Sequence, residues 1–188
     1  KKPAVMDRSE GGVTFCGGEP LMQPDFLLEL LTRCGKEDIH RAVDTTLYAS
    51  EEVVERVIPQ CDLFLVDLKM MDSEKHRHYC GVPNERVLAN LKRVAASDVP
   101  YWIRIPLIVG VNADEENIRK SAEFLASLPK PPEIVNLLVY HDIGKNKHDK
   151  LGTTYNPNQF TMQAPDEATQ KRCLDIFAEY QLKAKIGG

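Results

Sequence analysis

Short apolar runs alternate with longer segments of helical spacing along almost the whole chain. The runs are rich in β-branched and aromatic residues, and they lie at 13–15, 41–43, 63–68, 101–109 and 134–140. Between them apolar residues recur every three or four positions, as at Val87, Leu88, Leu91 and Val94, which indicates amphipathic helices. Strand–helix–strand repetition predicts parallel strands joined by helical crossovers. Because the runs are apolar on both alternations, we expect strands covered on both faces.

The number of these units limits the α/β fold. Five runs give about five β/α units, which is too few for a closed eight-stranded barrel. They suit either an open doubly wound sheet or a partial, barrel-like curved sheet. At 188 residues and 43% hydrophobic content, the chain can build one sizeable core, so we expect a single domain over residues 1–188.

Three positions have the pattern of helix N-termini. Ser50 precedes two glutamates, Asn112 is followed three residues later by Glu115, and Asp166 follows a proline. These patterns predict an N-cap, a capping box and the start of the last helix, respectively.

The composition argues against several classes of partner. The net charge of −4 and pI of about 5.8 disfavour a nucleic acid, which needs a basic surface. No apolar run approaches the roughly 20 residues of a membrane span. The first ten residues lack both an initiator Met and the apolar core of a signal peptide. We therefore expect a soluble, cytoplasmic protein without membrane contact, whose first residue is an interior point of a longer chain.

Five cysteines stand at positions 16, 34, 61, 80 and 173. An odd number in a chain of this size predicts reduced thiols rather than a disulfide framework. Their spacing contains no Cys-x-x-Cys pair, so the chain carries no recognisable zinc or iron–sulfur motif. Cys16, Cys61 and Cys173 have apolar sequence neighbours, which predicts small buried thiols.

Polar or ionisable groups lie at or near the end of each predicted strand. These groups are Gly17-Gly18-Glu19, Asp44-Thr45-Thr46, Asp67-Leu68-Lys69, Arg104 and Tyr140-His141. In parallel α/β folds function collects at the carboxyl ends of the strands, so we expect these groups at one edge. Singly, each has a structural explanation: a tight turn for the glycines, a loop cap for Asp44, an ion pair for Asp67 with Lys69, and a core position for His141. Their coincidence at one edge favours a binding site.

The residue types at this edge suit a zwitterion. The two glycines expose backbone that a ligand can approach without meeting a Cβ atom. Three acids, Glu19, Asp44 and Asp67, supply oxygens for an ammonium group or a hard cation. The three basic side chains supply donors for a carboxylate or for sugar and base edges.

In its motifs and their order the chain resembles the glycyl-radical-enzyme activating enzymes, the pyruvate formate-lyase activating group of the radical S-adenosylmethionine superfamily. The similarity covers nearly the whole chain and is carried by "GGVTFCGGEPLMQPDFL", "FLVDLKMMD", "EKHRHYCGVPNERVLANL", "WIRIPLIVGVN", "LLVYHDIGK", "LGTTY" and "IGG". The fold that this resemblance implies is a partial (β/α)6 barrel, here lacking its first strand.

The resemblance also implies how S-adenosylmethionine would be held. Gly17, Gly18 and Glu19 match the motif that holds its methionyl amine. His141 matches the residue that lies against the bound S-adenosylmethionine.

A second set of implied roles concerns the methionyl carboxylate and the target. Asp44, Thr45 and Asp67 look like the family's monovalent-cation site beside that carboxylate, and all three would thereby also contribute to cofactor binding. Lys69 and Arg104 would contact S-adenosylmethionine or the loop that delivers the target glycine, and so act in catalysis.

The implied activity is that of an activase. A reduced [4Fe–4S] cluster would cleave S-adenosylmethionine, and the resulting radical would take a hydrogen from a glycine Cα in a pyruvate formate-lyase-like partner. A flavodoxin- or ferredoxin-type protein would donate the electron. Cluster binding needs cysteine thiolates, and the family's Cys-x-x-x-Cys-x-x-Cys motif precedes the segment that this chain matches. We therefore expect the chain alone to be inactive.

Three positions depart from the family's pattern. Cys16 stands where a serine is usual, so it is not expected to bind a cluster. Leu47 stands where a glycine often follows the strand end, and Val139 stands where a proline is common before the Tyr-His pair. The last two differences concern the geometry of loops.

Two other functions are open to these residues. Lys69 at a strand end suits the amine nucleophile of a Schiff-base aldolase on a β/α barrel, although Asp67 counts against the neutral amine that this chemistry needs. Alternatively, the chain is a non-catalytic module that docks a glycyl radical enzyme. Without a preceding strand, the first strand would expose a sheet edge, through which we expect association.

Overall fold

The computed structural model describes residues 11–141 and 160–188. Its strands are β1 (Gly12–Phe15), β2 (His40–Thr45), β3 (Leu63–Asp67), β4 (Tyr101–Leu107), β5 (Ile134–Val139) and β6 (Ala184–Ile186). Its helices are α2 (Pro24–Lys36), α3 (Glu51–Val57), α4 (Ser73–Cys80), α5 (Glu85–Ala96), α6 (Glu115–Ala126) and α8 (Glu167–Glu179), with short 3-10 turns η1 (Pro20–Met22) and η2 (Ile58–Gln60). The first five strands confirm the predicted runs, whereas β6 is not predicted by the sequence pattern.

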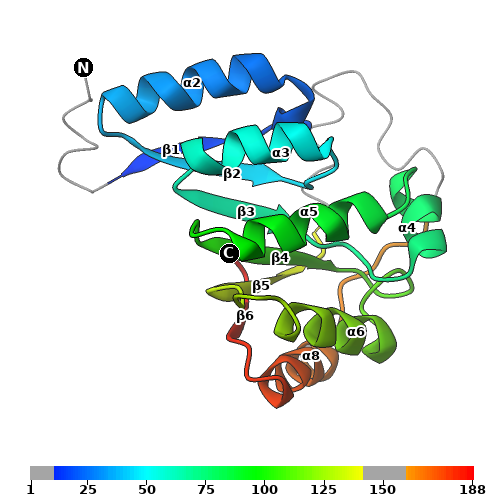
Figure 1. The fold of residues 1–188 in the computed structure, drawn as a ribbon. Coiled ribbons are helices and arrows are strands. Elements are labelled where there is room, and N and C mark those ends of the chain that lie inside the picture. Colours follow the sequence, from blue (N-terminus) through cyan, green and yellow to red (C-terminus); the bar gives the residue numbers. More distant parts are fainter. Residues whose placement is uncertain (1–10, 142–159) are drawn as a thin grey trace.

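The six described strands form one parallel sheet in chain order, from β1 to β6. Each crossover moves to the next strand in the same direction, and parallel crossovers are right-handed, so the helices gather on one side. Figure 1 shows α2, α3, α5, α6 and α8 along that side of the sheet. This order fits the partial, barrel-like sheet and not the doubly wound one, which has helices on both faces.

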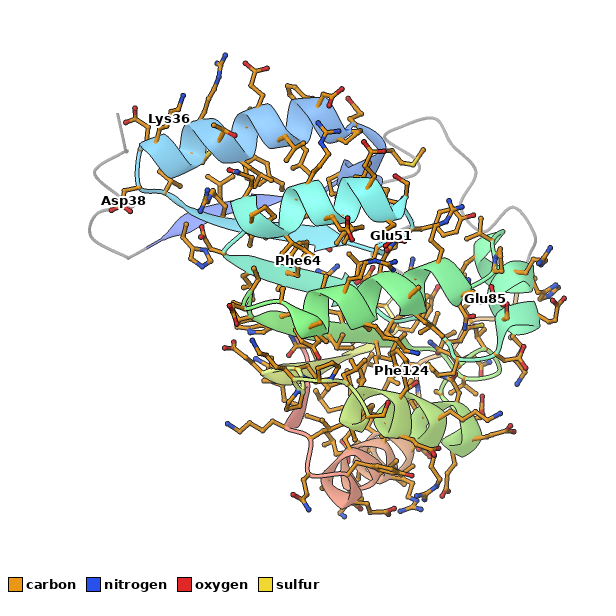
Figure 2. All side chains as sticks on the ribbon, viewed as in Figure 1. Lys36, Asp38, Glu51, Phe64, Glu85 and Phe124 are labelled. Carbon is orange, nitrogen blue, oxygen red and sulfur yellow. The ribbon has the colours of Figure 1, made fainter. Side chains whose placement is uncertain are left out.

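The two faces of the sheet are covered differently. On β4, Ile103 and Ile105 are fully buried toward the helices, whereas the alternating residue Arg104 is only half-buried. Phe64 on β3 lies between the sheet and the helices, while Glu85 points outward from α5 (Figure 2). The expectation of strands covered on both faces is wrong for the described residues, because a sheet wound in one direction leaves its concave face without a helix layer.

Two of the three predicted helix starts are confirmed. Ser50 and Asp166 cap α3 and α8 with side-chain oxygens that accept from the N–H three residues on. The predicted capping box at Asn112 is wrong, because Asp114 caps α6 instead. In the ranges 11–141 and 160–188, no helix is long and apolar enough to span a membrane.

Two of the three cysteines expected to be buried are buried. Cys61 and Cys173 lie in the core, and burial raises the pKa of Cys61 to about 12. Cys16 is exposed, so that prediction is wrong. The reason is that β1 ends at Phe15, which places Cys16 in the open loop before the glycines.

Candidate functional site

The carboxyl edge of the sheet brings together charged groups from three neighbouring strands. In the parallel register, Asp44 on β2 lies opposite Leu65, and Asp67 on β3 lies opposite Arg104 on β4. Residues in register, or two apart on one strand, point to the same face. The two carboxylates and the guanidinium therefore share the concave face of the sheet.

Arg104 joins the two aspartates. Its Nε and Nη2 donate to Asp67 Oδ1 over 2.9 and 2.8 Å, and Nη2 also donates to Asp44 Oδ1. Burial raises the pKa of Asp44, although Arg104 opposes the rise. Burial lowers the pKa of Arg104, but pairing with Asp67 and Asp44 outweighs it, so the net pKa is raised. Two carboxylates share one guanidinium, which leaves a net negative charge in this group.

Glu19 is oriented by residues around the end of β2. Its Oε1 accepts from the Thr45 hydroxyl over 2.7 Å and from the Leu21 N–H over 3.0 Å. Its Oε2 accepts from the Thr46 N–H over 2.8 Å and from the Thr46 hydroxyl over 2.5 Å. The Thr45 hydroxyl also accepts from the Leu47 N–H over 2.9 Å. Thr45, expected beside a cation, thus uses its hydroxyl to fix the Glu19 carboxylate.

Gly17 and Gly18 leave the backbone open beside Glu19. Their φ angles are +95° and +52°, in the left-handed region that favours glycine. A Cβ atom at either position would meet no atom within 4 Å. Backbone conformation rather than packing therefore requires these glycines, and the open space suits a ligand.

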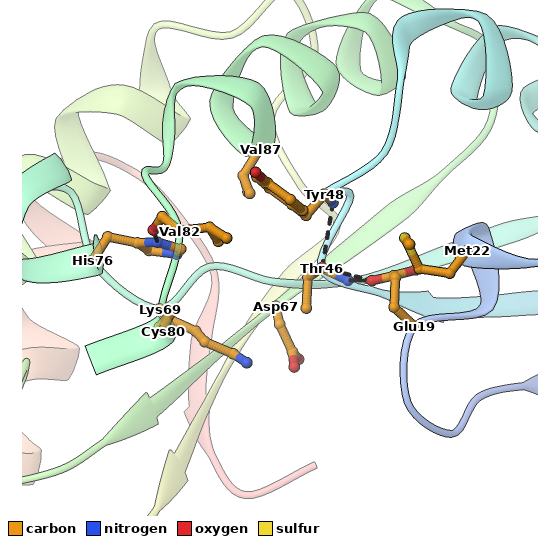
Figure 3. Close-up of a pocket in the computed structure, with 10 residues that line it drawn as sticks. All are labelled: Glu19, Met22, Thr46, Tyr48, Asp67, Lys69, His76, Cys80, Val82 and Val87. Carbon is orange, nitrogen blue, oxygen red and sulfur yellow. Dashed lines mark hydrogen bonds between the residues drawn. The ribbon is translucent and has the colours of Figure 1, made fainter. Parts of the chain in front are cut away.

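Two cavities that Asp67 lines adjoin these groups. One of about 240 Å³ has Glu19 and Thr46 on one side and Lys69 and His76 on the other (Figure 3). The second, of about 440 Å³, extends toward the end of β4. Asp67, Lys69 and Cys80 line both cavities. The ion pair of Asp67 is with Arg104 rather than with Lys69, so the alternative of an Asp67–Lys69 pair is not what the structure shows.

His141 is not among the residues that line these two cavities. It follows β5 and is exposed. The alternative of a core histidine is therefore wrong. The residues of the "LGTTY" segment lie outside the described part of the chain.

Buried asparagines hold the loops at this edge, and the sequence pattern does not predict this role. They are Asn84, Asn90, Asn112 and Asn117. Asn90 Nδ2 donates to the Leu47 and Ala49 carbonyls over 2.9 Å each, and Asn112 Nδ2 donates to the Lys69 carbonyl over 2.7 Å. Loops whose carbonyls are satisfied by buried amides keep their shape. The only sequence signal is that three of them, Asn84, Asn90 and Asn112, fall in segments that carry the family resemblance.

Leu47 adopts the backbone conformation expected of a glycine. Its φ is +59°, and its side chain is fully buried. This conformation costs about 1 kcal/mol in a residue with a side chain, whereas burying a leucine contributes about 2 kcal/mol. Burial therefore offsets the strain, and the loop keeps its shape without the glycine that the family often has there.

The described residues do not fit an iron–sulfur cluster. In the ranges 11–141 and 160–188, no three His, Cys, Asp or Glu side chains are grouped so as to hold a metal ion. The five cysteines are all free thiols at separate places. Because a [4Fe–4S] cluster needs cysteine thiolates, no step through a cluster is assigned to these residues.

Comparison with known proteins identifies the family. Residues 5–122 match the Radical SAM superfamily. The chain belongs to this superfamily. It is 40% identical, over 97% of its length, to the trans-4-hydroxy-L-proline dehydratase activating enzyme of Clostridioides difficile, of which it covers 60%. It is 36% identical, over 98% of its length, to the indoleacetate decarboxylase activating enzyme of Tractidigestivibacter scatoligenes, of which it covers 58%.

A solved structure supports the same fold. The crystal structure of a domain of pyruvate-formate lyase-activating enzyme from Bacteroides vulgatus is 56% identical, with a TM-score of 0.81 and coverage of 95% of this chain and 99% of that one. The radical SAM family uses S-adenosylmethionine and a [4Fe–4S] cluster. This chain spans less than two thirds of the length of the curated activating enzymes that it matches.

Proposed function

We propose that this chain is the S-adenosylmethionine-binding part of an activating enzyme for a glycyl radical enzyme. A reduced [4Fe–4S] cluster, for which the described residues supply no ligand group, would provide the electron that cleaves S-adenosylmethionine, and the radical formed would remove a hydrogen from a glycine Cα in a pyruvate formate-lyase-like partner. The names of the curated relatives, which are activating enzymes, support this proposal. Because the described residues do not hold a cluster, we expect the chain alone to bind S-adenosylmethionine without cleaving it.

The fixed carboxylate of Glu19 carries the proposal. Four donors orient it, and it stands beside the uncovered backbone of Gly17 and Gly18. Its fixed negative charge can therefore attract an ammonium group such as the methionyl amine. Lys69, on the boundary of both cavities, supplies a cation for the methionyl carboxylate, and His141 is proposed to lie against the far end of the ligand.

Calorimetric titration of the chain with S-adenosylmethionine tests the proposal. We expect Glu19→Gln to raise Kd about 10- to 100-fold, because a favourable interaction between two charged groups of this kind contributes about 1.5–3 kcal/mol. The matched control is Glu29→Gln on α2, which removes a surface carboxylate paired with Arg33 and should leave Kd unchanged. Absence of binding by the unaltered chain, or equal weakening by both variants, would contradict the proposal.

The partner, the electron donor and the location belong to the same proposal. The protein substrate is a glycyl radical enzyme, the donor is a flavodoxin- or ferredoxin-type protein, and a cytoplasmic setting fits the expected reduced thiols. A non-catalytic docking module would bind the partner but not S-adenosylmethionine, so the same titration separates the two. The comparisons do not favour a Schiff-base aldolase, and borohydride with a small aldehyde should leave no adduct on Lys69.

A further inference from the structure

A single guanidinium nitrogen lies between the two carboxylates of the site. Arg104 Nη2 donates both to Asp44 Oδ1 and to Asp67 Oδ1, the second over 2.8 Å. An ion bound between these two Oδ1 atoms would lie where this nitrogen lies. That position is the one to which the family resemblance assigns a monovalent cation.

We propose that Arg104 takes the place of that cation and acts as a built-in counter-ion that positions Asp44 and Asp67. The inference concerns the site of the proposed function, but its evidence is the geometry of three side chains. Thr45 does not complete a cage for an ion with its hydroxyl, which bonds to Glu19 and to the Leu47 N–H. Two observations therefore disagree with the expected cation site: Arg104 lies between the two aspartates, and the Thr45 hydroxyl is used elsewhere.

The chemistry of arginine favours the replacement of a bound cation by Arg104. The guanidinium is planar, stays charged, and presents several donors at fixed angles, and here it reaches from β4 across β3 to β2. Because it is tethered to the sheet, its local concentration does not fall on dilution, unlike that of free K⁺. The three side chains are 21–24% exposed, so the pairs are only partly screened by water.

The group also keeps a charge for a ligand. One guanidinium neutralises only one of the two carboxylates, and Glu19 adds a further negative charge close enough to act on Asp44. A cationic group of a ligand can therefore be attracted to this edge without an added metal ion. Arg104 fixes the orientation of the two carboxylates before the cationic group of the ligand arrives.

The test compares salts rather than ligands. Thermal unfolding of the whole chain is followed in about 200 mM KCl and in choline chloride of equal ionic strength, with a chelator to remove divalent ions. We expect the unaltered chain to have the same Tm in both salts. Arg104→Gln frees the space between the carboxylates, so its Tm should be about 3–5 °C higher in KCl than in choline chloride.

Arg41→Gln is the matched control. It removes an arginine from a partly buried pair with Asp62 at the opposite edge of the sheet, where a single carboxylate remains. We expect a lower Tm for this variant without any preference for K⁺. Arg104→Met serves as a second variant in case Arg104→Gln does not fold, and ²⁰⁵Tl NMR should show Tl⁺ binding only when Arg104 is replaced.

Two results would overturn the inference. One is a saturable, K⁺-specific rise in Tm, or Tl⁺ binding, in the unaltered chain. The other is a folded Arg104 variant that shows neither response. No arm uses S-adenosylmethionine, so failure here is distinguishable from failure of the proposed function.

Discussion

Two groups of arginine and aspartate lie at opposite ends of the same strands, and they are built differently. At the amino edge, Arg41 Nε and Nη2 donate to the two oxygens of Asp62 over 2.8 Å each, and the Arg41 backbone N–H donates to Asp62 as well. At the carboxyl edge, one arginine is shared by Asp44 and Asp67. The first group is balanced in charge, whereas the second is not.

The pKa directions follow from this difference. Hydrogen bonding to Arg41 lowers the pKa of Asp62, so ionised Asp62 stabilises the fold. Burial raises the pKa of Asp44 despite Arg104, so ionised Asp44 costs stability. The amino edge is therefore arranged for stability, while the carboxyl edge retains an unfavourable charge that a cationic ligand can relieve.

Removing one aspartate from each edge should give the largest contrast. We expect Asp62→Asn to lower the free energy of unfolding at pH 7 by about 2 kcal/mol, because it weakens three hydrogen bonds to a charged acceptor. Asp44→Asn should change it by less than about 0.5 kcal/mol, because the lost hydrogen bond is offset by removal of a penalised charge. Urea unfolding of both variants measures this, and equal losses would break the comparison.

The pH dependence gives the same contrast with opposite signs. The contribution of Asp62, whose pKa is lowered, is present above its unfolded pKa and is lost as pH falls, so the deficit of Asp62→Asn should shrink on acidification. The contribution of Asp44, whose pKa is raised, is present below its unfolded pKa and is lost as pH rises through the folded one. Asp44→Asn should therefore gain relative to the unaltered chain as pH rises.

Glycines at the two edges offer a second, smaller contrast. A Cβ on Gly12 would lie 2.4 Å from the His40 carbonyl oxygen of β2, so Gly12→Ala should cost about 1.5 kcal/mol by displacing the strand. Gly17→Ala meets no atom and should cost about 1 kcal/mol through its backbone conformation. The effects on ligand affinity should rank in the opposite order. We expect Gly17→Ala to weaken S-adenosylmethionine binding and Gly12→Ala to leave it unchanged. Chemical denaturation and calorimetry together check both orders.

An exposed but balanced group between α6 and α8 should give the smallest effect. Glu115 accepts from Arg119 over 2.9 Å and from Arg172 over 2.6 Å, and Glu179 accepts from both arginines. Hydrogen bonding to Arg172 and Arg119 lowers the pKa of Glu115 from 4.5 to about 2. The small Tm difference between Glu115→Gln and the unaltered chain should vanish as pH falls from 4.5 to about 2. Added salt should also reduce this difference. If Glu115→Gln lost as much stability as Asp62→Asn, burial would not explain the difference between this exposed group and the Arg41–Asp62 pair.

The sequence predicts the strands and the charged edge but not the pairing within it. Asp67 and Lys69 point to one side of a strand, which favours them as partners, yet the partner of Asp67 is Arg104 from the next strand. Only the register between β3 and β4 brings these two together, and register is a property of the folded sheet. The charged edge itself was predictable because each strand run ends on a polar group.

Two features of the fold, the strand β6 and the half-buried face of β4, could not be predicted from the sequence for other reasons. The strand β6 is only three residues long and contains a lysine (Ala184–Ile186), so it has no apolar run to detect. Trp102 and Pro106 on β4 are apolar by type but only half-buried. Residue type therefore cannot tell a face that is covered by helices from one that lines a concave surface.

The strained leucine at the end of β2 ties ligand recognition to the interior of the protein. Leu47 is buried in the core, and Thr46, the residue before it, holds the carboxylate of Glu19. Moving that carboxylate would disturb a close-packed core, which resists small displacements. Little conformational entropy is then lost when a ligand arrives, because its acceptor is already in place. If Glu19 binds the ligand as proposed, this side of the site is preorganised, and selectivity would come from the ligand fitting the site as it stands.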